Sequence, residues 1–246
     1  MSRTIFVWDI HWCFDEFLEL LEKINFDYEN DSLYLTGDLI NKWPKWYELI
    51  DFLVNRPKIK SVIWNNEVNF LRYIAGLQDL NRIAGWEQDF RIIEGLCGNK
   101  NIENFQTLIK KGLFDKTYQK HNPLFEEYLK KFSDKHIEYI LNLPLYVEAE
   151  NWILLHWGLV PGKKLEEHHI DEITRIRQYN WKPWYEFYTW NKTVIYWHWA
   201  ADGLRIRKNT KWLDSWCVYG KRLTAYIWET QEIVQVSAKK VYVEVE

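Results

Sequence analysis

Polar residues that could bind metal follow several apolar, β-prone runs of the chain. Ligands of open α/β sheets bind beyond the carboxyl ends of the strands, so these residues would share one edge of a sheet. Two carboxylates, three imidazoles and an amide form a mixed oxygen and nitrogen set, which suits Mn, Fe, Zn, Co or Mg better than thiolate-preferring metals. The residues are Asp9, His11, Asp38, Asn65, His156 and His198, with Glu67 two residues after Asn65.

Six such groups exceed what one four-coordinate metal needs, whereas two metals sharing one aspartate would use all of them. Each group also has an ordinary explanation when taken singly. An aspartate after a strand is often only a turn or cap residue, and a lone interior histidine is usually just hydrogen-bonded. The joint pattern therefore favours a site. The remaining histidines lie in polar helical stretches, and we expect them to be solvated: His121, His136, His168 and His169.

The elements that must position these residues begin as an alternation of strands and helices, the βαβαβ rhythm of an α/β sheet. Strands are predicted at 4–7, 33–36 and 61–63, and helices near 14–24, 47–54 and 68–74. Residues 77–143 lack clear strands, and we predict a helical insertion or cap there, within a single domain that spans 1–246.

The C-terminal part is rich in short apolar runs, which predict a meandering, antiparallel set of strands. We place them at 145–148, 153–155, 194–196, 217–219, 223–228, 233–236 and 241–245, with a helix near 171–177.

Composition limits the function classes. A chain of 246 residues with 47% hydrophobic content can bury a sizeable core. No apolar run reaches the roughly 18 residues of a membrane span, and the apolar start is too short for a signal peptide, so we expect a cytoplasmic protein without a membrane partner. Three cysteines without CxxC spacing indicate neither a disulfide framework nor a zinc ribbon. A net charge of -3 argues against a generic nucleic-acid binder.

The order and wording of the blocks resemble the calcineurin-like metallophosphoesterase superfamily, in its branch of bacterial symmetrical diadenosine tetraphosphatases and serine/threonine protein phosphatases. Family blocks read GDxHG, GDxxDRG or GDxxNRG, GNHE, HAGL or HGGL, and GH. This chain has "WDIHW" at 8–12, "GDLINKW" at 37–43, "WNNE" at 64–67, "HWGLVPG" at 156–162 and "WHWA" at 197–200. Its tail "WLDSWCVYGKRLTAYIWE" resembles the family ending GLDTGCVWGGKLTALRLED.

The resemblance implies an α/β fold, a metallophosphoesterase β-sandwich flanked by helices in α-β-β-α layers, with a helical cap insertion. It also implies two divalent metal ions, Mn²⁺ first, with Fe, Zn, Co or Mg as alternatives. Carried over residue by residue, Asp9, His11 and Asp38 hold one metal. The second metal takes Asp38, Asn65, His156 and His198, so that Asp38 bridges and a metal-bridging hydroxide attacks phosphorus.

Three further positions correspond to family residues that contact the phosphate or protonate the leaving group. Arg177 matches a phosphate-contacting arginine, with Arg175 as the alternative. Lys42 replaces an arginine that grips phosphate as a fork, and supplies only a point charge. Asn66 replaces the histidine that protonates the leaving group, and an amide cannot deliver a proton. A nucleotide phosphate leaves as a stable anion without that acid, because its second pKa is near about 6.

The chain holds 16 tryptophans but only 10 glycines. Eight tryptophans stand where the family has a small residue: Trp8, Trp12, Trp43, Trp64, Trp157, Trp197, Trp212 and Trp216. One hypothesis is that the source reads the UGA codon as glycine, as some bacterial lineages do; eight more glycines would bring the content to the usual level of about 7%. Trp46, Trp152, Trp181 and Trp190 could belong to this group, whereas Trp184, Trp199 and Trp228 look like true tryptophans. The competing hypothesis is that all the indoles are present, in an engineered or non-catalytic chain.

The sequence thus predicts a phosphohydrolase for phosphoanhydrides of nucleotides, such as dinucleoside tetraphosphates. The alternatives are a serine/threonine protein phosphatase, whose partner is a phosphoprotein, and a catalytically impaired pseudophosphatase that only binds. The expected partner is a small nucleotide substrate.

Overall fold

The computed structural model describes residues 2–8, 10, 13–40, 45–63, 67, 131–169, 172–173, 176–196 and 204–243. The chain divides into two compact units. The first unit joins Met1–Asn65 to Pro144–Glu246, and the second comprises Asn66–Leu143. In the first unit the backbone N–H of Ile63 donates to the carbonyl oxygen of Pro144 at 2.8 Å, so the chain leaves and re-enters this unit at adjacent points.

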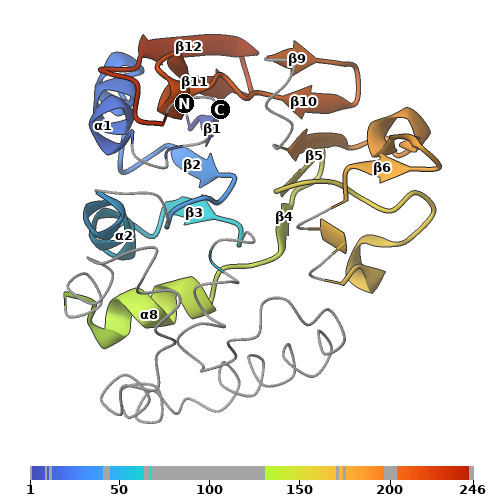
Figure 1. Cartoon of the computed structure of the whole chain (residues 1–246), viewed down its shortest axis with the longest axis horizontal. Coiled ribbons are helices and arrows are strands. Elements are labelled where there is room, and N and C mark those ends of the chain that lie inside the picture. Colours follow the sequence, from blue (N-terminus) through green and yellow to red (C-terminus); the bar gives the residue numbers. More distant parts are fainter. Residues whose placement is uncertain are drawn as a thin grey trace. The chain divides into compact units, whose positions relative to one another are not determined.

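The first sheet of this unit has β1 at its centre, and its strand order is β12-β11-β1-β2-β3 (Figure 1). The three N-terminal strands are parallel, as the βαβαβ rhythm predicts, while the two C-terminal strands are antiparallel. Their bounds are β1 Thr4–Val7, β2 Ser32–Leu35, β3 Ile59–Ser61, β11 Arg222–Ile227 and β12 Glu232–Ser237.

Two helices, α1 (Phe14–Lys23) and α2 (Trp46–Val54), cover the outer face of the first sheet (Figure 1). Apolar residues at helical spacing form their inward faces, and Phe17, Leu20 and Leu21 of α1 are buried. These two helices make the parallel crossovers between β1, β2 and β3. The carboxyl ends of the three strands therefore lie at one edge of the sheet.

The second sheet has the order β4-β5-β8-β10-β9. Its strands are β4 Tyr146–Glu148, β5 Trp152–Leu155, β8 Thr193–Tyr196, β9 Arg205–Ile206 and β10 Thr210–Trp212. The prediction of an antiparallel meander is wrong here, because β5, β8 and β10 run parallel. The physical reason is the long segment between β5 and β8, which crosses back over the sheet, as parallel pairing requires.

A hydrophobic core lies between the two sheets and is rich in aromatic residues. It consists of Phe6, Trp8, Val62, Trp152, Leu154, Trp157, Ile195, Leu213 and Tyr226, which come from both sheets and the loops that follow their strands. A second cluster covers the opposite face of the second sheet. Within the described residues that layer consists of the 3-10 helices η1 (Leu165–Glu167) and η2 (Trp184–Phe187) and the hairpin of β6 (Gln178–Tyr179) and β7 (Lys182–Pro183).

Two predicted C-terminal strands are not strands. Residues 217–219 form the 3-10 helix η3 (Cys217–Tyr219), which lies between the left-handed residues Trp216 and Gly220. The described residues 241–243 pair with no strand; instead the N–H groups of Tyr242 and Val243 donate to the carbonyl oxygen of Val218. The other predicted strands agree with the structure to within about two residues, the boundary error that such patterns carry. The short strands β6, β7, β9 and β10 were not predicted.

The second unit contains α8 (Asp134–Leu141) within its described part. Most of the insertion predicted at 77–143 lies outside the described residues, as does the helix predicted at 68–74, and the single-domain reading stays a prediction. His136 was predicted to be solvated and is buried, because its ring closes a capping box with Ser133. His168 was also predicted to be solvated and is buried. Its Nδ1 lies 2.7 Å from the carbonyl oxygen of Lys164, and its Nε2 accepts the N–H of Val160 at 2.8 Å.

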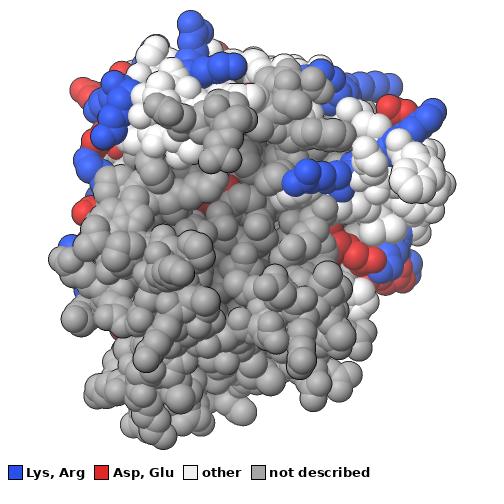
Figure 2. Space-filling view, in the orientation of Figure 1, with Lys and Arg blue, Asp and Glu red and all other residues white. Residues whose placement is uncertain are grey.

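The charged residues described on the face shown in Figure 2 are of both signs. In Figure 2, Lys and Arg side chains lie among Asp and Glu around the rim of this face, without a continuous basic patch on the described part of it. Among the described residues, no helix is both long enough and apolar enough to cross a bilayer. The cytoplasmic location stays a prediction.

Candidate metal centre

Asp38 lies in the loop that follows β2, and the backbone of this loop is unusual. Gly37 and Asp38 are successive residues in the left-handed region, with φ of 95° and 57°. A non-glycine residue there is uncommon, and such conformations cluster at functional sites. The side chain of Asp38 is carried into the interior, where the residue is only 1% exposed.

His156 lies directly after β5 of the second sheet and is fully buried. Its Nδ1 lies 2.6 Å from the carbonyl oxygen of Thr36, two residues before Asp38. This hydrogen bond joins the carboxyl-terminal loops of β2 and β5, which belong to different sheets. Asp38 and His156 therefore converge at one edge of the sandwich, as the sequence predicts.

The bond to Thr36 also settles the chemistry that His156 offers. A carbonyl oxygen can only accept, so Nδ1 must donate its hydrogen. In the neutral ring Nε2 then presents a lone pair, which is the form that binds metal. Histidine ligands in metal sites usually have this kind of outer hydrogen bond. Together with the buried carboxylate of Asp38, the donors present fit a divalent cation of the Mn, Fe, Zn, Co or Mg type.

Arg177 packs against the side chain of Trp157. The carbon at the centre of its guanidinium is 4.4 Å from the centroid of the Trp157 indole, the residue that follows His156 in the chain. A cation over an aromatic face at this distance is an attractive contact. The side chain predicted to contact phosphate is thus held against one of the tryptophans that replace a small residue of the family.

The other predicted site residues lie outside the described part of the chain. They are Asp9, His11, Lys42, Asn65, Asn66 and His198, together with Arg175, Trp12, Trp43, Trp64 and Trp197. Their roles stay predictions. The first three blocks follow β1, β2 and β3, which are parallel and end at one edge of the sheet. Val7 and Ile63, which come directly before the first and third blocks, are buried, and so is Trp8, the first residue of the first block.

One cluster of potential ligands was not predicted. Among the described residues, Cys13, Glu16 and Cys217 form a group whose potential ligand atoms lie within 4.8 Å of one another. The carboxylate of Glu16 accepts hydrogen bonds from the backbone N–H of Lys239 at 2.7 Å and from the hydroxyl of Tyr242 at 2.8 Å. Its oxygens are thereby used to hold the C-terminal segment on α1, so we interpret the cluster as an anchor. The spacing of two isolated cysteines gave no signal for it.

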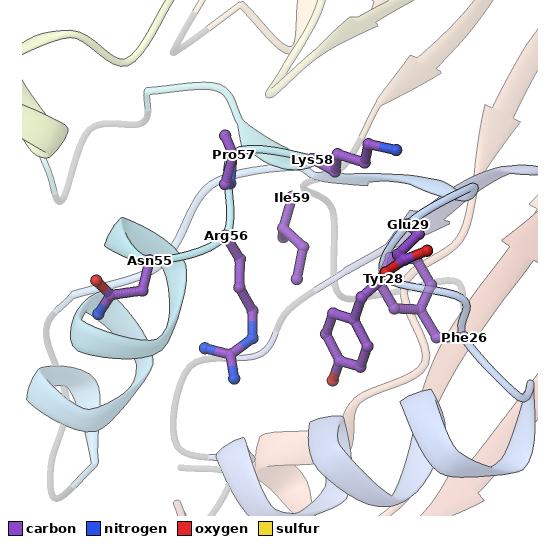
Figure 3. A pocket seen from close by; sticks show the side chains of 8 residues that line it. All are labelled: Phe26, Tyr28, Glu29, Asn55, Arg56, Pro57, Lys58 and Ile59. Atoms are coloured by element: carbon purple, nitrogen blue, oxygen red, sulfur yellow. The ribbon is translucent and has the colours of Figure 1, made fainter.

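A cavity of about 590 Å³ lies away from the candidate centre, between the loops that precede β2 and β3 (Figure 3). Those loops are at the amino ends of the parallel strands, opposite the edge that holds Asp38. Arg56, one of the lining residues, already has partners. The central carbon of its guanidinium lies 3.6 Å from the centroid of the Phe52 ring, and the guanidinium donates to the carbonyl oxygen of Phe52 at 2.9 Å. We assign no chemistry to this cavity.

Comparison with known proteins tests the family. The model of the calcineurin-like phosphoesterase family matches residues 2–228, which is nearly the whole chain. The chain belongs to this family. The match establishes the phosphohydrolase class and the sandwich fold.

Several members of the family are similar to this chain over most of its length or over part of it. The chain is 25% identical to the symmetrical bis(5'-nucleosyl)-tetraphosphatase of Colwellia psychrerythraea, covering 92% of this chain and 95% of that one. The namesake from Buchnera aphidicola is 43% identical over 77 residues, which cover 31% of this chain and 28% of the relative. A crystal structure whose description names a diadenosine tetraphosphatase is 25% identical, covers 96% of this chain and 93% of its own, and has a TM-score of 0.69. A protein serine/threonine phosphatase from Saccharomyces cerevisiae shares the fold at 13% identity, covers all of this chain and 81% of its own, and has a TM-score of 0.50.

Proposed function

We propose that the chain hydrolyses the phosphoanhydride bonds of dinucleoside polyphosphates, with diadenosine tetraphosphate as the representative substrate. The observation that carries the proposal is the hydrogen bond from His156 to Thr36, which brings the imidazole of His156 to the Asp38 loop. Two predicted ligands from different sheets thereby share one edge. The near full-length similarity to tetraphosphatases supports the substrate class.

The proposed ligand set is the one that the family blocks give. Asp9, His11 and Asp38 take one cation, and Asp38, Asn65, His156 and His198 take the other, with Mn²⁺ as the first candidate. When bound, two divalent cations lower the pKa of water to make a nucleophile and offset the charge of the phosphoryl oxygens. The chain itself holds the donors in place: Thr36 fixes the ring of His156, and the left-handed backbone carries the Asp38 carboxylate inward.

Positive side chains bind the polyphosphate. A polyphosphate carries several negative charges, so Arg177 and Lys42 have clear electrostatic partners in it. The guanidinium of Arg177 now lies on the indole of Trp157. With a small residue at 157 that indole is absent, and the guanidinium is free to form a fork with phosphate oxygens.

Asn66 decides between phosphoanhydride and phosphoester substrates. A serine alkoxide is a poor leaving group and needs a proton, which an asparagine amide cannot deliver. A nucleotide phosphate leaves as a stable anion and does not need that proton. The loss of the family histidine at this position therefore harms phosphoserine hydrolysis more than it harms phosphoanhydride hydrolysis.

The test uses the chain with glycine at the eight family positions, loaded with Mn²⁺. We expect it to cleave diadenosine tetraphosphate with a higher kcat/KM than a phosphoserine peptide. We also expect Asn66→His to raise the peptide reaction more than the nucleotide reaction. Faster cleavage of the peptide would contradict the proposal and favour a protein phosphatase. Full Mn²⁺ occupancy without turnover of either substrate would instead identify a binding protein.

A further inference from the structure

Two tryptophans have a backbone conformation that tryptophan rarely adopts. Six described non-glycine residues have positive φ, and two of them are Trp181 and Trp216, with φ of 64° and 61°. The left-handed region costs an ordinary L-residue roughly 1–2 kcal/mol, because Cβ approaches the following carbonyl oxygen. Asparagine and aspartate visit it more readily, but for a bulky residue it is an outlier. Glycine is the residue that adopts it without a penalty.

Trp181 occupies a turn with a strict sequence requirement. Strands β6 and β7 are joined by only two residues, Asn180 and Trp181, and both have positive φ. A two-residue hairpin with positive φ at both positions is a type I′ turn, for which Asn-Gly is the preferred sequence. Asparagine is present at the first position. At the second position the indole is 94% exposed, so its burial does not offset the cost of the backbone.

Trp216 stands at the start of η3 in the same conformation as the glycine at its end. Its φ and ψ are 61° and 37°, and those of Gly220 are 83° and 14°. The two left-handed residues let the chain enter and leave a helix of three residues. The N–H of Trp216 is held by the carboxylate of Asp214 at 2.9 Å, so the backbone is fixed and cannot relax freely to suit the side chain.

Trp8 and Trp212 show a different defect. Both are buried, at 1% and 2% exposure, and neither indole Nε1 has a hydrogen-bond partner within the described part of the chain. A buried indole N–H usually finds an acceptor. A buried donor without one costs about 1–3 kcal/mol.

Two other buried tryptophans, Trp152 and Trp184, lack these defects. The Nε1 of Trp184 donates to the carbonyl oxygen of Trp157 at 3.1 Å, and its ring packs against Tyr196 at 4.9 Å. Trp152 forms edge contacts with Phe6 at 5.0 Å and Tyr34 at 4.9 Å. Neither has positive φ. The chain therefore contains two populations of tryptophan, one that its fold accommodates and one that it does not.

From these two populations we infer that the protein made by its source carries glycine at positions 8, 181, 212 and 216, each encoded by a UGA codon that the source reads as glycine. Trp12, Trp43, Trp64, Trp157 and Trp197 belong to the same group by their family blocks. Trp152, Trp184 and Trp228 are true tryptophans with UGG codons. Two of the positions that the sequence left open are thereby assigned: position 152 as tryptophan and position 181 as glycine.

Peptide mass spectrometry of the protein isolated from its source is the direct test. Trypsin releases residues 212–221, which contain positions 212 and 216 and end at Lys221. It also releases residues 223–239, which contain Trp228 and serve as the matched control. We expect the first peptide to have the mass of two Trp-to-Gly replacements and the second to have its printed mass. The printed mass for both peptides would overturn the inference.

The coding DNA gives the same answer without any folded protein. We expect UGA at codons 8, 181, 212 and 216 and UGG at codons 152, 184 and 228. UGG at all seven would overturn the inference.

Stability measurements test the physical premise on the printed chain. Trp181→Gly should raise Tm by roughly 2–8 °C, since it removes a backbone cost of about 1–2 kcal/mol without removing buried surface. Trp184→Gly is the matched control and should lower Tm, because it deletes a buried ring and a satisfied hydrogen bond. A fall in Tm for Trp181→Gly would contradict the premise. Neither these readouts nor the codons depend on which substrate the protein cleaves.

Discussion

Asp31 and Asp38 are both buried carboxylates at 1% exposure, but their surroundings give them different tasks. Asp31 is paired with Arg3, whose Nε lies 3.2 Å from one of its oxygens, and it accepts the N–H of Asp27 at 3.0 Å. Asp38 lies in a left-handed loop, two residues after Thr36, whose carbonyl oxygen accepts a hydrogen bond from His156. The first carboxylate stabilises the fold, whereas we propose that the second binds a cation.

Substitution of each aspartate should separate these tasks. Asp38→Asn should weaken Mn²⁺ binding by more than 100-fold, because an amide replaces the charged bridging ligand, while the unfolding transition changes little. Asp31→Asn should bind Mn²⁺ normally and lose about 2 kcal/mol of unfolding free energy. Titration calorimetry and urea unfolding of both variants measure the two effects. Equal loss of metal binding in both variants would contradict the assignment.

The Arg3–Asp31 pair also gives a pH dependence. Burial alone would raise the pKa of Asp31, but the hydrogen bonds from Arg3 and from backbone N–H groups outweigh it and hold the pKa below its usual 3.8. A lowered folded-state pKa means that the unfolded state binds the proton first. The stabilisation is therefore complete above 3.8 and is lost as the pH falls through the folded-state pKa.

We accordingly expect the difference in unfolding free energy between the parent chain and Asp31→Asn to shrink from about pH 5 toward about pH 2. Urea unfolding at several pH values measures it. A difference that stays constant over this range would show that the carboxylate is not held below its usual pKa.

Single residues were predictable where a sequence block marks them and unpredictable where only tertiary contacts decide. Asp38 and His156 could be assigned because each follows an apolar strand in a recognisable block. His136 and His168 could not, because their partners are backbone groups that only the folded loops bring into reach.

Two glycines show how elements depend on different properties of one residue type. A Cβ on Gly158 would lie 2.3 Å from Nε1 of Trp184, so the loop after β5 needs glycine for space. Gly162 has φ of +84° and open space around it, so its turn needs glycine for conformation.

Gly158→Ala should therefore cost about 2–3 kcal/mol of unfolding free energy, because the indole of Trp184 must move and its hydrogen bond is lost. Gly162→Ala should cost only about 1 kcal/mol, the penalty of the left-handed backbone. Urea unfolding of the two variants compares them. A larger loss for Gly162→Ala would reverse the assignment of space and conformation.

Apolar patterns were sufficient to predict α1 and the parallel strands of the first sheet, since α1 buries one apolar face and β1 is a continuous apolar run that is buried on both faces. The pattern failed at 217–219, where the apolar residues Cys217 and Val218 are buried within a 3-10 helix. A short apolar run does not distinguish a strand from a tight turn when the conformation is set by left-handed residues at both ends. It also contains no information on strand direction, which is why the parallel β5, β8 and β10 were missed.

For the molecule as a whole, the bond between Ile63 and Pro144 predicts that the second unit can be removed. Replacement of residues 66–143 by a short Gly/Ser linker should leave a first unit that unfolds cooperatively, because its two ends are adjacent and its core is its own. Replacement of residues 157–192 by the same linker should prevent folding. Those residues connect the end of β5 to the start of β8. Because the two strands are parallel, these two points lie at opposite edges of the sheet.

Circular dichroism during urea unfolding measures both variants. Non-cooperative unfolding of the first variant would show that the first unit depends on the second for its stability. A cooperative transition in the second variant would show that β5 and β8 tolerate a direct connection, against the topology.

The pairing of β1 with β11 has a consequence for biosynthesis. Ile5 lies opposite Ile227, so one side of the central strand receives its partner only when almost the whole chain has left the ribosome. Until then β1 presents an unpaired edge, the kind of surface that templates aggregation. Any event that stops translation early, such as a codon read differently by the ribosome of another host, would release fragments with that edge exposed.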